Sequence, residues 1–189
     1  MRSTPAVRGY FGIGVEGVSK PMNLGALLRT AHAFGASFAF VIAPDLRMRD
    51  AKRSDTSDSP QHLPFYSFPN VAELRLPKDC RLVGVELLDE AVELPSFRHP
   101  QQAAYVLGPE RGRLSPELTQ ACDFLIRIPT RFCVNLSVAG AIVMYDRMLS
   151  LGRFSERPLV PGGTLEAPPV HKHGAPIWVR RRARRSGKE

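Results

Sequence analysis

The sequence predicts an α/β fold in which a mostly parallel sheet carries helices on both faces. Short apolar segments of strand length alternate along the chain with segments whose apolar residues recur at helical spacing, a pattern typical of this class. The chain has 189 residues, of which 43% are hydrophobic, so it can bury one core of ordinary size. We therefore expect one folded domain over residues 1–152, followed by a separate segment over residues 153–189.

The individual elements follow from local patterns. The expected strands are apolar runs at 10–15, 37–42, 82–86, 103–107 and 124–128. The expected helices lie at 23–34, 115–121 and 135–151. Ser115 is a favourable N-cap, Pro116 is a favourable first helical residue, and Gly152 is expected to end the last helix.

The segment Asn23–Gly35 carries an amide and a guanidinium at the start of an apolar helix. One face of this helix is formed by Leu24, Leu27, Leu28, Ala31 and Phe34. Arg29 lies off that face. Because the helix follows a strand, Asn23 and Arg29 are expected near a carboxyl strand end, where open α/β sheets bind ligands. A capping asparagine and a surface arginine would give the same local pattern.

Two later strands run into turns rich in glycine or proline. The strand at 103–107 continues into Gly108–Gly112, and the strand at 124–128 ends at Pro129. Small and polar residues from Cys133 to Gly140 then open the last helix. Each turn alone is explained by ordinary turn chemistry.

A glycine pattern near the first strand resembles a dinucleotide-binding fingerprint. Gly12, Gly14 and Gly17 satisfy G-x-G-x-x-G, but residues 18–21 intervene before any helical periodicity begins. The acidic residue expected about 20 positions further on is also missing from 36–44. We therefore expect these glycines to allow close packing and a tight strand exit.

Positive charge is concentrated at the C-terminus. Residues 171–189 hold seven basic residues and one acidic residue, and so carry +6 of the net charge of +8. A Pro/Gly-rich linker at 157–169 separates them from the domain. Clustered arginines suit a phosphate backbone, although a solvated tail would have the same composition.

The polar segment 45–64 is expected to form a long loop, which either contacts RNA or is solvated.

The remaining composition excludes several classes of protein. Cys80, Cys122 and Cys133 have neither C-x-x-C spacing nor histidines at ligand spacing, so we expect no disulfide framework and no metal site. No apolar run approaches the roughly 18–20 residues of a membrane span. The polar segment 1–8 lacks the apolar region of a signal peptide. A cytoplasmic protein without a membrane partner is expected.

Together, the segments 23–35, 103–117 and 124–145 resemble the signature motifs of the SpoU/TrmH branch of the SPOUT RNA methyltransferases. The resemblance spans residues 9–152 and implies a doubly wound α/β domain with a C-terminal deep trefoil knot. It also implies S-adenosylmethionine as cofactor, bound by three loops. The cofactor-binding residues it indicates are Leu87, Gly108, Ile128, Val134 and Asn135.

The reaction implied by the resemblance is methyl transfer to a ribose 2′-hydroxyl of tRNA or rRNA, with Arg29 and Asn23 as catalytic residues. Because arginine stays protonated, we expect Arg29 to bind a phosphate and stabilise developing negative charge, with direct abstraction of the hydroxyl proton by Arg29 as the alternative. Glu110 is a candidate either to orient Arg29 or to cap the glycine turn in which Glu110 itself lies.

Relatives pair through the last helix, so a homodimer is expected in which Arg29 of one subunit can face the cofactor of the other. The candidate RNA contacts are Arg29, Arg111, Arg131, Arg180, Arg181 and Arg182.

One departure from the family pattern leaves an alternative open. Relatives commonly carry Ser-Leu-Asn where this chain has Cys133-Val134-Asn135, and a thiol is a weaker hydrogen-bond partner than a hydroxyl. A catalytically weak RNA-binding relative is therefore a second hypothesis. A small-molecule dinucleotide enzyme, based on the glycine pattern alone, is a third.

Overall fold

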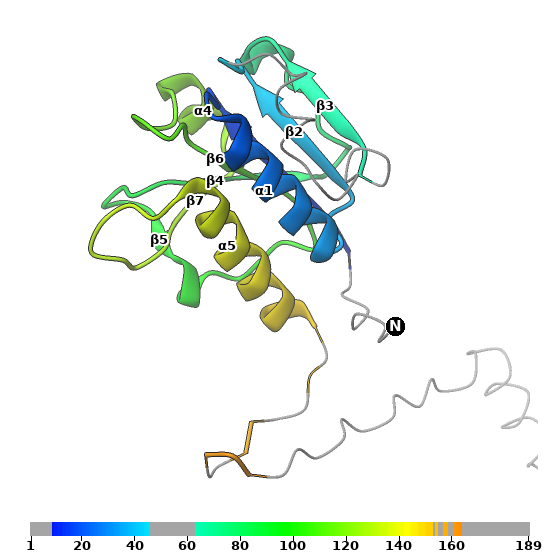
Figure 1. Ribbon diagram of the computed structural model, residues 1–189, viewed down its shortest axis with the longest axis vertical. Coiled ribbons are helices and arrows are strands. Elements are labelled where there is room, and N and C mark those ends of the chain that lie inside the picture. The colour runs from blue at the N-terminus through cyan, green and yellow to red at the C-terminus, as the bar shows by residue number, and fades with distance from the viewer. Residues whose placement is uncertain (1–8, 46–62, 153, 155–156, 159–160, 164–189) are drawn as a thin grey trace, which may run out of the picture. The chain divides into compact units, whose positions relative to one another are not determined.

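The computed structural model describes residues 9–45, 63–152, 154, 157–158 and 161–163 (Figure 1). Contacts divide the chain into a unit at 1–153 and a second unit at 154–189, and all described strands and helices belong to the first. Its strands are β1 (Tyr10–Glu16), β2 (Phe38–Ile42), β3 (Phe65–Phe68), β4 (Arg81–Val85), β5 (Val92–Glu93), β6 (Gln102–Leu107) and β7 (Phe124–Arg127). Its helices are α1 (Pro21–Ala33), α4 (Pro116–Ala121), α5 (Leu136–Leu151) and the short 3₁₀ helices η1 (Val71–Glu73) and η2 (Leu94–Ser96).

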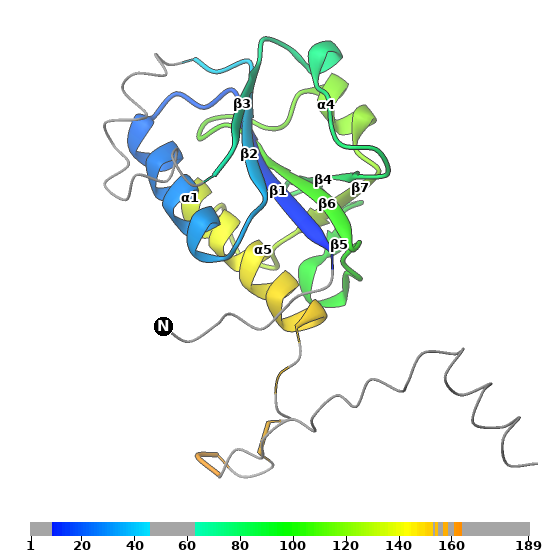
Figure 2. The same ribbon diagram turned by 90° about the vertical axis from the view of Figure 1, so that its right-hand side faces the viewer.

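The seven described strands form one sheet in the order β3-β2-β1-β6-β4-β7-β5, and every neighbouring pair is parallel. Helices α1 and α5 pack side by side on one face, and α4 covers the other (Figure 2). A larger apolar core lies under α1 and α5 and a smaller one under α4. The predicted parallel sheet with helices on both faces is thus confirmed.

All five expected strands and all three expected helices are present, with ends within two residues of the prediction. Two strands were missed, β3 and β5. Both lie at the sheet edges, and β5 has only two residues. Such short edge strands are defined by the neighbour they pair with rather than by their own composition. Most of the polar segment 45–64 lies outside the described residues.

The glycines of β1 are packing residues. A Cβ on Gly12 would lie 2.2 Å from the Phe38 ring, and one on Gly14 would lie 2.5 Å from the Phe40 ring. Gly17, with φ of +61°, takes the left-handed conformation in which the chain leaves the strand. These glycines therefore admit the aromatic side chains of β2, as expected.

Substituting Gly12 with alanine is expected to lower the free energy of unfolding by about 1–3 kcal/mol, because the added methyl group overlaps a buried ring. Urea unfolding followed by circular dichroism would measure it. Truncating the ring with Phe38→Leu should recover part of that loss in the Gly12→Ala background. Strictly additive losses in the double variant would contradict a steric conflict between the two side chains.

Helix termini follow the local chemistry of the chain. In α1, Pro21 is the first helical residue, and the apolar residues of the expected face are buried with the exception of half-buried Phe34. In α4, the Ser115 hydroxyl accepts a hydrogen bond from Leu118 N, as its predicted N-cap role requires. The same hydroxyl donates to the buried Glu16 carboxylate at the end of β1, which ties α4 to the sheet.

A buried arginine joins α5 to the amino ends of β1 and β6. Arg147, only 1% exposed, donates to the carbonyl oxygens of Tyr10, Pro100 and Gln101 and to the Tyr105 hydroxyl. His99 lies next to it, with Nδ1 2.6 Å from the Tyr105 hydroxyl and Nε2 2.8 Å from Asp146 Oδ2. Burial raises the pKa of Tyr105 to about 12. This polar cluster was not predicted from the sequence.

Burial lowers the pKa of His99, although its hydrogen bond to Asp146 acts in the opposite direction. The unfolded chain takes up this proton near pH 6.5, whereas the folded chain does so only at lower pH. As the pH is lowered from 6.5, the free energy of unfolding should therefore decrease, and this group contributes up to about 1.4 kcal/mol per pH unit.

Urea unfolding between pH 7.5 and 5 would measure this dependence. The variant His99→Gln should have a flatter profile over the same range, because it lacks the titrating group. Profiles of equal slope in the two proteins would show that His99 does not set the acid dependence.

Candidate functional site

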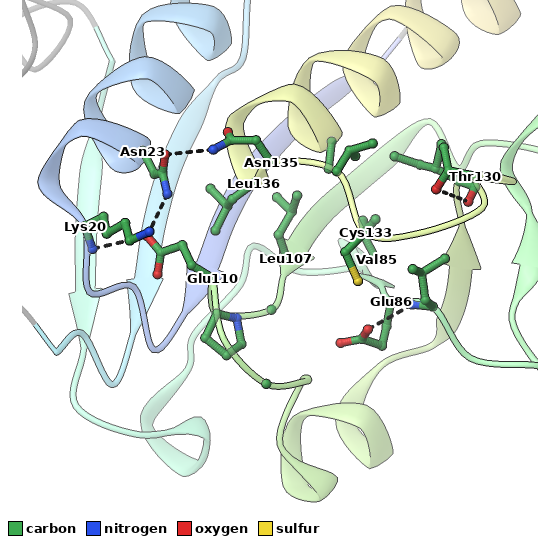
Figure 3. Close-up of a pocket in the computed structure, with 17 residues that line it drawn as sticks. Lys20, Asn23, Val85, Glu86, Leu107, Glu110, Thr130, Cys133, Asn135 and Leu136 are labelled. Carbon is green, nitrogen blue, oxygen red and sulfur yellow. Dashed lines mark hydrogen bonds between the residues drawn. The ribbon is translucent and has the colours of Figure 1, made fainter.

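A cavity of about 330 Å³ opens at the carboxyl ends of the central strands (Figure 3). Four segments that are distant in the sequence form its walls: the start of α1, the turn after β4, the glycine turn after β6 and the loop before α5. Apolar walls come from Val85, Leu107, Ile128, Val134 and Leu136. The volume falls within the range of small-molecule pockets, and the position is the one where parallel α/β sheets bind their ligands.

The structure brings the predicted cofactor-binding residues together. The cavity is lined by all five of them, namely Leu87, Gly108, Ile128, Val134 and Asn135. Asn23, predicted as a catalytic residue, lines it as well. Arg111 and Arg131 are exposed and stand next in sequence to the lining residues Glu110 and Thr130.

Glu110 fixes the glycine turn to the start of α1. Its Oε2 accepts hydrogen bonds from Ser19 N and from the Ser19 hydroxyl, both at 3.1 Å. Its Oε1 accepts from Lys20 N at 3.1 Å and from Asn23 Nδ2 at 3.0 Å. These partners of Glu110 belong to the approach to α1 and to its first turn, and Arg29 of the same subunit is not among them.

Burial would by itself raise the pKa of Glu110. The hydrogen bonds donated by Ser19, Asn23, Lys20 and the residue's own backbone outweigh this effect and hold the pKa below its usual value. The carboxylate is therefore ionised at neutral pH, and it anchors the first turn of α1 in a charge-assisted network.

The network continues across the cavity to α5. Asn23 Oδ1 accepts a hydrogen bond from Asn135 Nδ2 at 3.1 Å (Figure 3). Asn135 is the N-cap of α5, and its Oδ1 accepts from Ser137 N and from the Ser137 hydroxyl. Each amide thus has one defined orientation, with the Asn23 amide group donating to a carboxylate and its oxygen accepting from a second amide. Asn23 and Asn135, both predicted as site residues, therefore connect α1, α5 and the glycine turn after β6 by hydrogen bonds.

Arg29 lies away from this cavity. It follows Asn23 by six residues along α1, which corresponds to a rise of about 9 Å and a rotation of about 240° around the helix. Its side chain is exposed and does not line the cavity. Within one subunit, therefore, only Asn23 of the two predicted catalytic residues reaches the site.

Sequence reasoning missed Glu86, which lines the cavity directly after β4. Its Oε1 accepts a hydrogen bond from Leu87 N, and its Oε2 accepts from Leu114 N, both at 2.9 Å. Cys133 was considered only as a departure from a family motif; it is exposed and also lines the cavity. The signal that could have found Glu86 is its place at the carboxyl end of a strand.

Other predicted features have different outcomes. Arg180, Arg181 and Arg182 lie outside the described residues. All three cysteines are free thiols. Within the described part of the chain, no three histidine, cysteine, aspartate or glutamate side chains gather as a metal site would require. None of the described helices is both long and apolar enough to cross a membrane.

The fold and the site define a class: a parallel α/β domain with a small-molecule pocket made by loops at the carboxyl ends of its central strands. Residues 11–145 match the SpoU rRNA Methylase family. The chain belongs to this family.

The relatives agree with that assignment. A 23S rRNA (guanosine-2′-O-)-methyltransferase, RlmB, of Coxiella burnetii is 34% identical over 155 residues, which cover 77% of this chain and 59% of the relative. The chain spans little more than half the length of the curated bacterial relatives it matches.

Solved structures share the fold. An rRNA methyltransferase from Sinorhizobium meliloti superposes with a TM-score of 0.69 at 22% identity, over 79% of this chain and 59% of that one. The SpoU methyltransferase AviRb from Streptomyces viridochromogenes, in complex with AdoMet, gives a TM-score of 0.67 at 23% identity, over 77% of this chain and 59% of that one.

Proposed function

We propose that this protein transfers the methyl group of S-adenosylmethionine to a ribose 2′-hydroxyl of rRNA or tRNA. The observation that carries the proposal is the cavity at the carboxyl strand ends, where Asn23, the Gly108 turn and the loop before α5 meet in a member of the SpoU family. The RlmB relative is named for this reaction on 23S rRNA, and AviRb was crystallised with the cofactor. We place the activity in the cytoplasm.

The residues of the cavity suit the proposed cofactor. Apolar side chains from Leu107, Val134 and Leu136 offer a surface for a purine, and carboxylate and amide groups are among the polar groups of the lining. At Gly108 a Cβ would lie only 3.1 Å from Glu86 Oε2, so the missing side chain keeps this wall open. When bound, the cofactor supplies a methyl group on a positively charged sulfur.

The chain must then position the hydroxyl; as its oxygen bonds to the methyl carbon, the bond from that carbon to sulfur breaks, S-adenosylhomocysteine leaves, and the hydroxyl proton passes to solvent water. The hydrogen bond that Asn23 donates to Glu110 and the one that it accepts from Asn135 fix the Asn23 amide at the cavity wall, where it can orient an RNA ribose. Arg29 is assigned to the phosphate next to that ribose and to the negative charge that develops on the hydroxyl oxygen. Arg111 and Arg131 are proposed as further phosphate contacts beside the cavity.

Because Arg29 lies outside its own subunit's cavity, we assign it to the cavity of a second subunit in a homodimer. The support is an apolar hollow between α1 and α5, lined by Thr30, Phe34, Ser137, Val138, Ala141, Ile142 and Tyr145. Val138, in the first turn of α5, is 48% exposed and Tyr145, near its middle, is 49% exposed. Together with the hollow they form one apolar surface that a second subunit can cover.

The trefoil knot is also part of the proposal. The strand β7 enters the sheet between β4 and β5, although both precede it in the chain. From there the chain continues to α5, which packs against α1 and contacts the central strand β6. A late strand inserted between earlier ones is the arrangement that threading of the C-terminal segment requires. An experimental structure traced through residues 86–151 would test it.

The function is tested by incubating the full chain with RNA and S-adenosylmethionine carrying a labelled methyl group, then mapping labelled nucleotides by mass spectrometry. A labelled ribose 2′-oxygen in rRNA or tRNA is the expected result. Binding of cofactor and RNA without transfer would instead favour the catalytically weak relative suggested by Cys133. In that case Cys133→Ser should restore transfer. Absence of cofactor binding would overturn the proposal.

A further inference from the structure

Glu86 stands beside Gly108 at the carboxyl edge of the sheet. Strands β4 and β6 are parallel neighbours, and Val85 is paired with Leu107 in their register. The next residue on each strand, Glu86 and Gly108, therefore leaves the sheet side by side. Both line the cavity, and the Glu86 carboxylate points into it (Figure 3).

The Glu86 carboxylate is held in place but retains hydrogen-bonding capacity. Each of its oxygens accepts one backbone N–H, from Leu87 and from Leu114, at 2.9 Å. A carboxylate offers about four lone-pair positions, so each oxygen can accept another hydrogen bond from the cavity. No lysine, arginine or histidine of the described residues forms an ion pair with it. Its ordered position therefore comes from the backbone of two loops.

The neighbouring Gly108 leaves this carboxylate uncovered. A Cβ at position 108 would lie 3.1 Å from Glu86 Oε2 and 3.2 Å from Leu114 N, so any side chain would press on this pair. Glu110, the other carboxylate of the cavity, already accepts four hydrogen bonds from the approach to α1 and from Asn23. Glu86 is thus the carboxylate that is left to meet a ligand.

A glycine turn after one parallel strand and an acidic residue at the end of a strand are the pair of features that holds a ribose in dinucleotide-binding folds. The glycines of β1 lack such an acid, but Gly108 has one on the adjacent strand. We propose that Glu86 binds the 2′- and 3′-hydroxyls of the cofactor ribose and so selects an adenosine ligand with an intact diol. This inference rests on the proposed function, since it concerns the same cavity.

Calorimetric titration of the full chain provides the test. The ligands are S-adenosylhomocysteine, which is the reaction's product, and its 2′,3′-dideoxy analogue, which lacks both hydroxyls. Glu86→Gln should weaken binding of S-adenosylhomocysteine about tenfold, because charge-assisted hydrogen bonds are lost. The same substitution should leave the weaker binding of the dideoxy analogue within about twofold of its original value. The matched control is Glu117→Gln, which removes the same charge from the exposed first turn of α4.

The comparison within one variant separates the role of Glu86 from damage to the loops. Equal weakening of the binding of both ligands would overturn the inference. It would show that Glu86 acts only by holding the backbone at Leu87 and Leu114 in place. Weakening of S-adenosylmethionine but not of S-adenosylhomocysteine would also overturn it, in favour of attraction to the cofactor's charge. If the unaltered protein methylates RNA and Glu86→Gln binds both ligands normally, only this inference fails. If the unaltered protein binds neither nucleoside, the proposed function fails and this inference with it.

Discussion

Replacing Arg29 with alanine is expected to lower the rate of methyl transfer by more than about a hundredfold, while the Kd for S-adenosylmethionine stays within about twofold. The reason is that Arg29 does not line the cavity of its own subunit, and in the partner's cavity it is assigned to the RNA phosphate and the reacting oxygen, not to the cofactor. Its proposed role is to stabilise charge that develops only during transfer. Calorimetry and single-turnover transfer of labelled methyl groups would measure the two quantities.

A mixture of two inactive variants shows which cavity Arg29 serves. Gly108→Val should close the cofactor cavity but keep Arg29, whereas Arg29→Ala keeps the cavity. If Arg29 acts on the partner subunit, dimers that contain one chain of each kind regain one complete site. Recovery of activity on mixing is therefore expected. No recovery from mixed dimers whose composition native mass spectrometry has verified would contradict this role, and a monomeric protein by light scattering would contradict the dimer itself.

Replacing Arg147 with methionine is expected to lower the free energy of unfolding by about 3–5 kcal/mol, because several hydrogen bonds from a charged donor are lost, each contributing about 1.5–3 kcal/mol before the gain from burying an apolar side chain. Arg147 is 1% exposed and donates to three backbone carbonyl groups and one hydroxyl group. Methionine fills similar volume but donates no hydrogen bond, so these buried acceptors would lose a charged donor, although Gln101 O keeps Tyr10 N and the Tyr105 hydroxyl keeps His99 Nδ1.

Urea unfolding of the variant would measure this loss. Arg113→Met is the control, since Arg113 is exposed and its replacement should change the free energy of unfolding by less than about 0.5 kcal/mol. Similar losses in the two variants would show that the effect comes from the lost charge alone. The Phe11 and Tyr105 rings, which face the guanidinium at 5.4 Å and 5.9 Å, would then contribute little.

Local patterns predicted the central elements because each is strongly periodic or apolar. The apolar face of α1, the Ser115 N-cap and the small residues that open α5 all reflect interactions between residues close in the sequence. Local patterns could not predict β5, whose two residues form a strand only because β7 lies beside them. They also gave no sign of Arg147, because its partners at 10, 100, 101 and 105 are brought to α5 by the fold.

The sequence by itself determined the α/β class, the family and the residues Asn23, Leu87, Gly108, Ile128, Val134 and Asn135 that the cavity contains. Motif chemistry allowed this, since glycine turns, caps and strand ends carry local signals. Only the tertiary structure decided which carboxylates face the cavity and which side chains bind one another. Glu110 reaches Asn23 across 87 residues, and Glu86 meets Gly108 through strand register. Such contacts are set by the pairing of parallel strands distant in the chain, and no local pattern encodes that pairing.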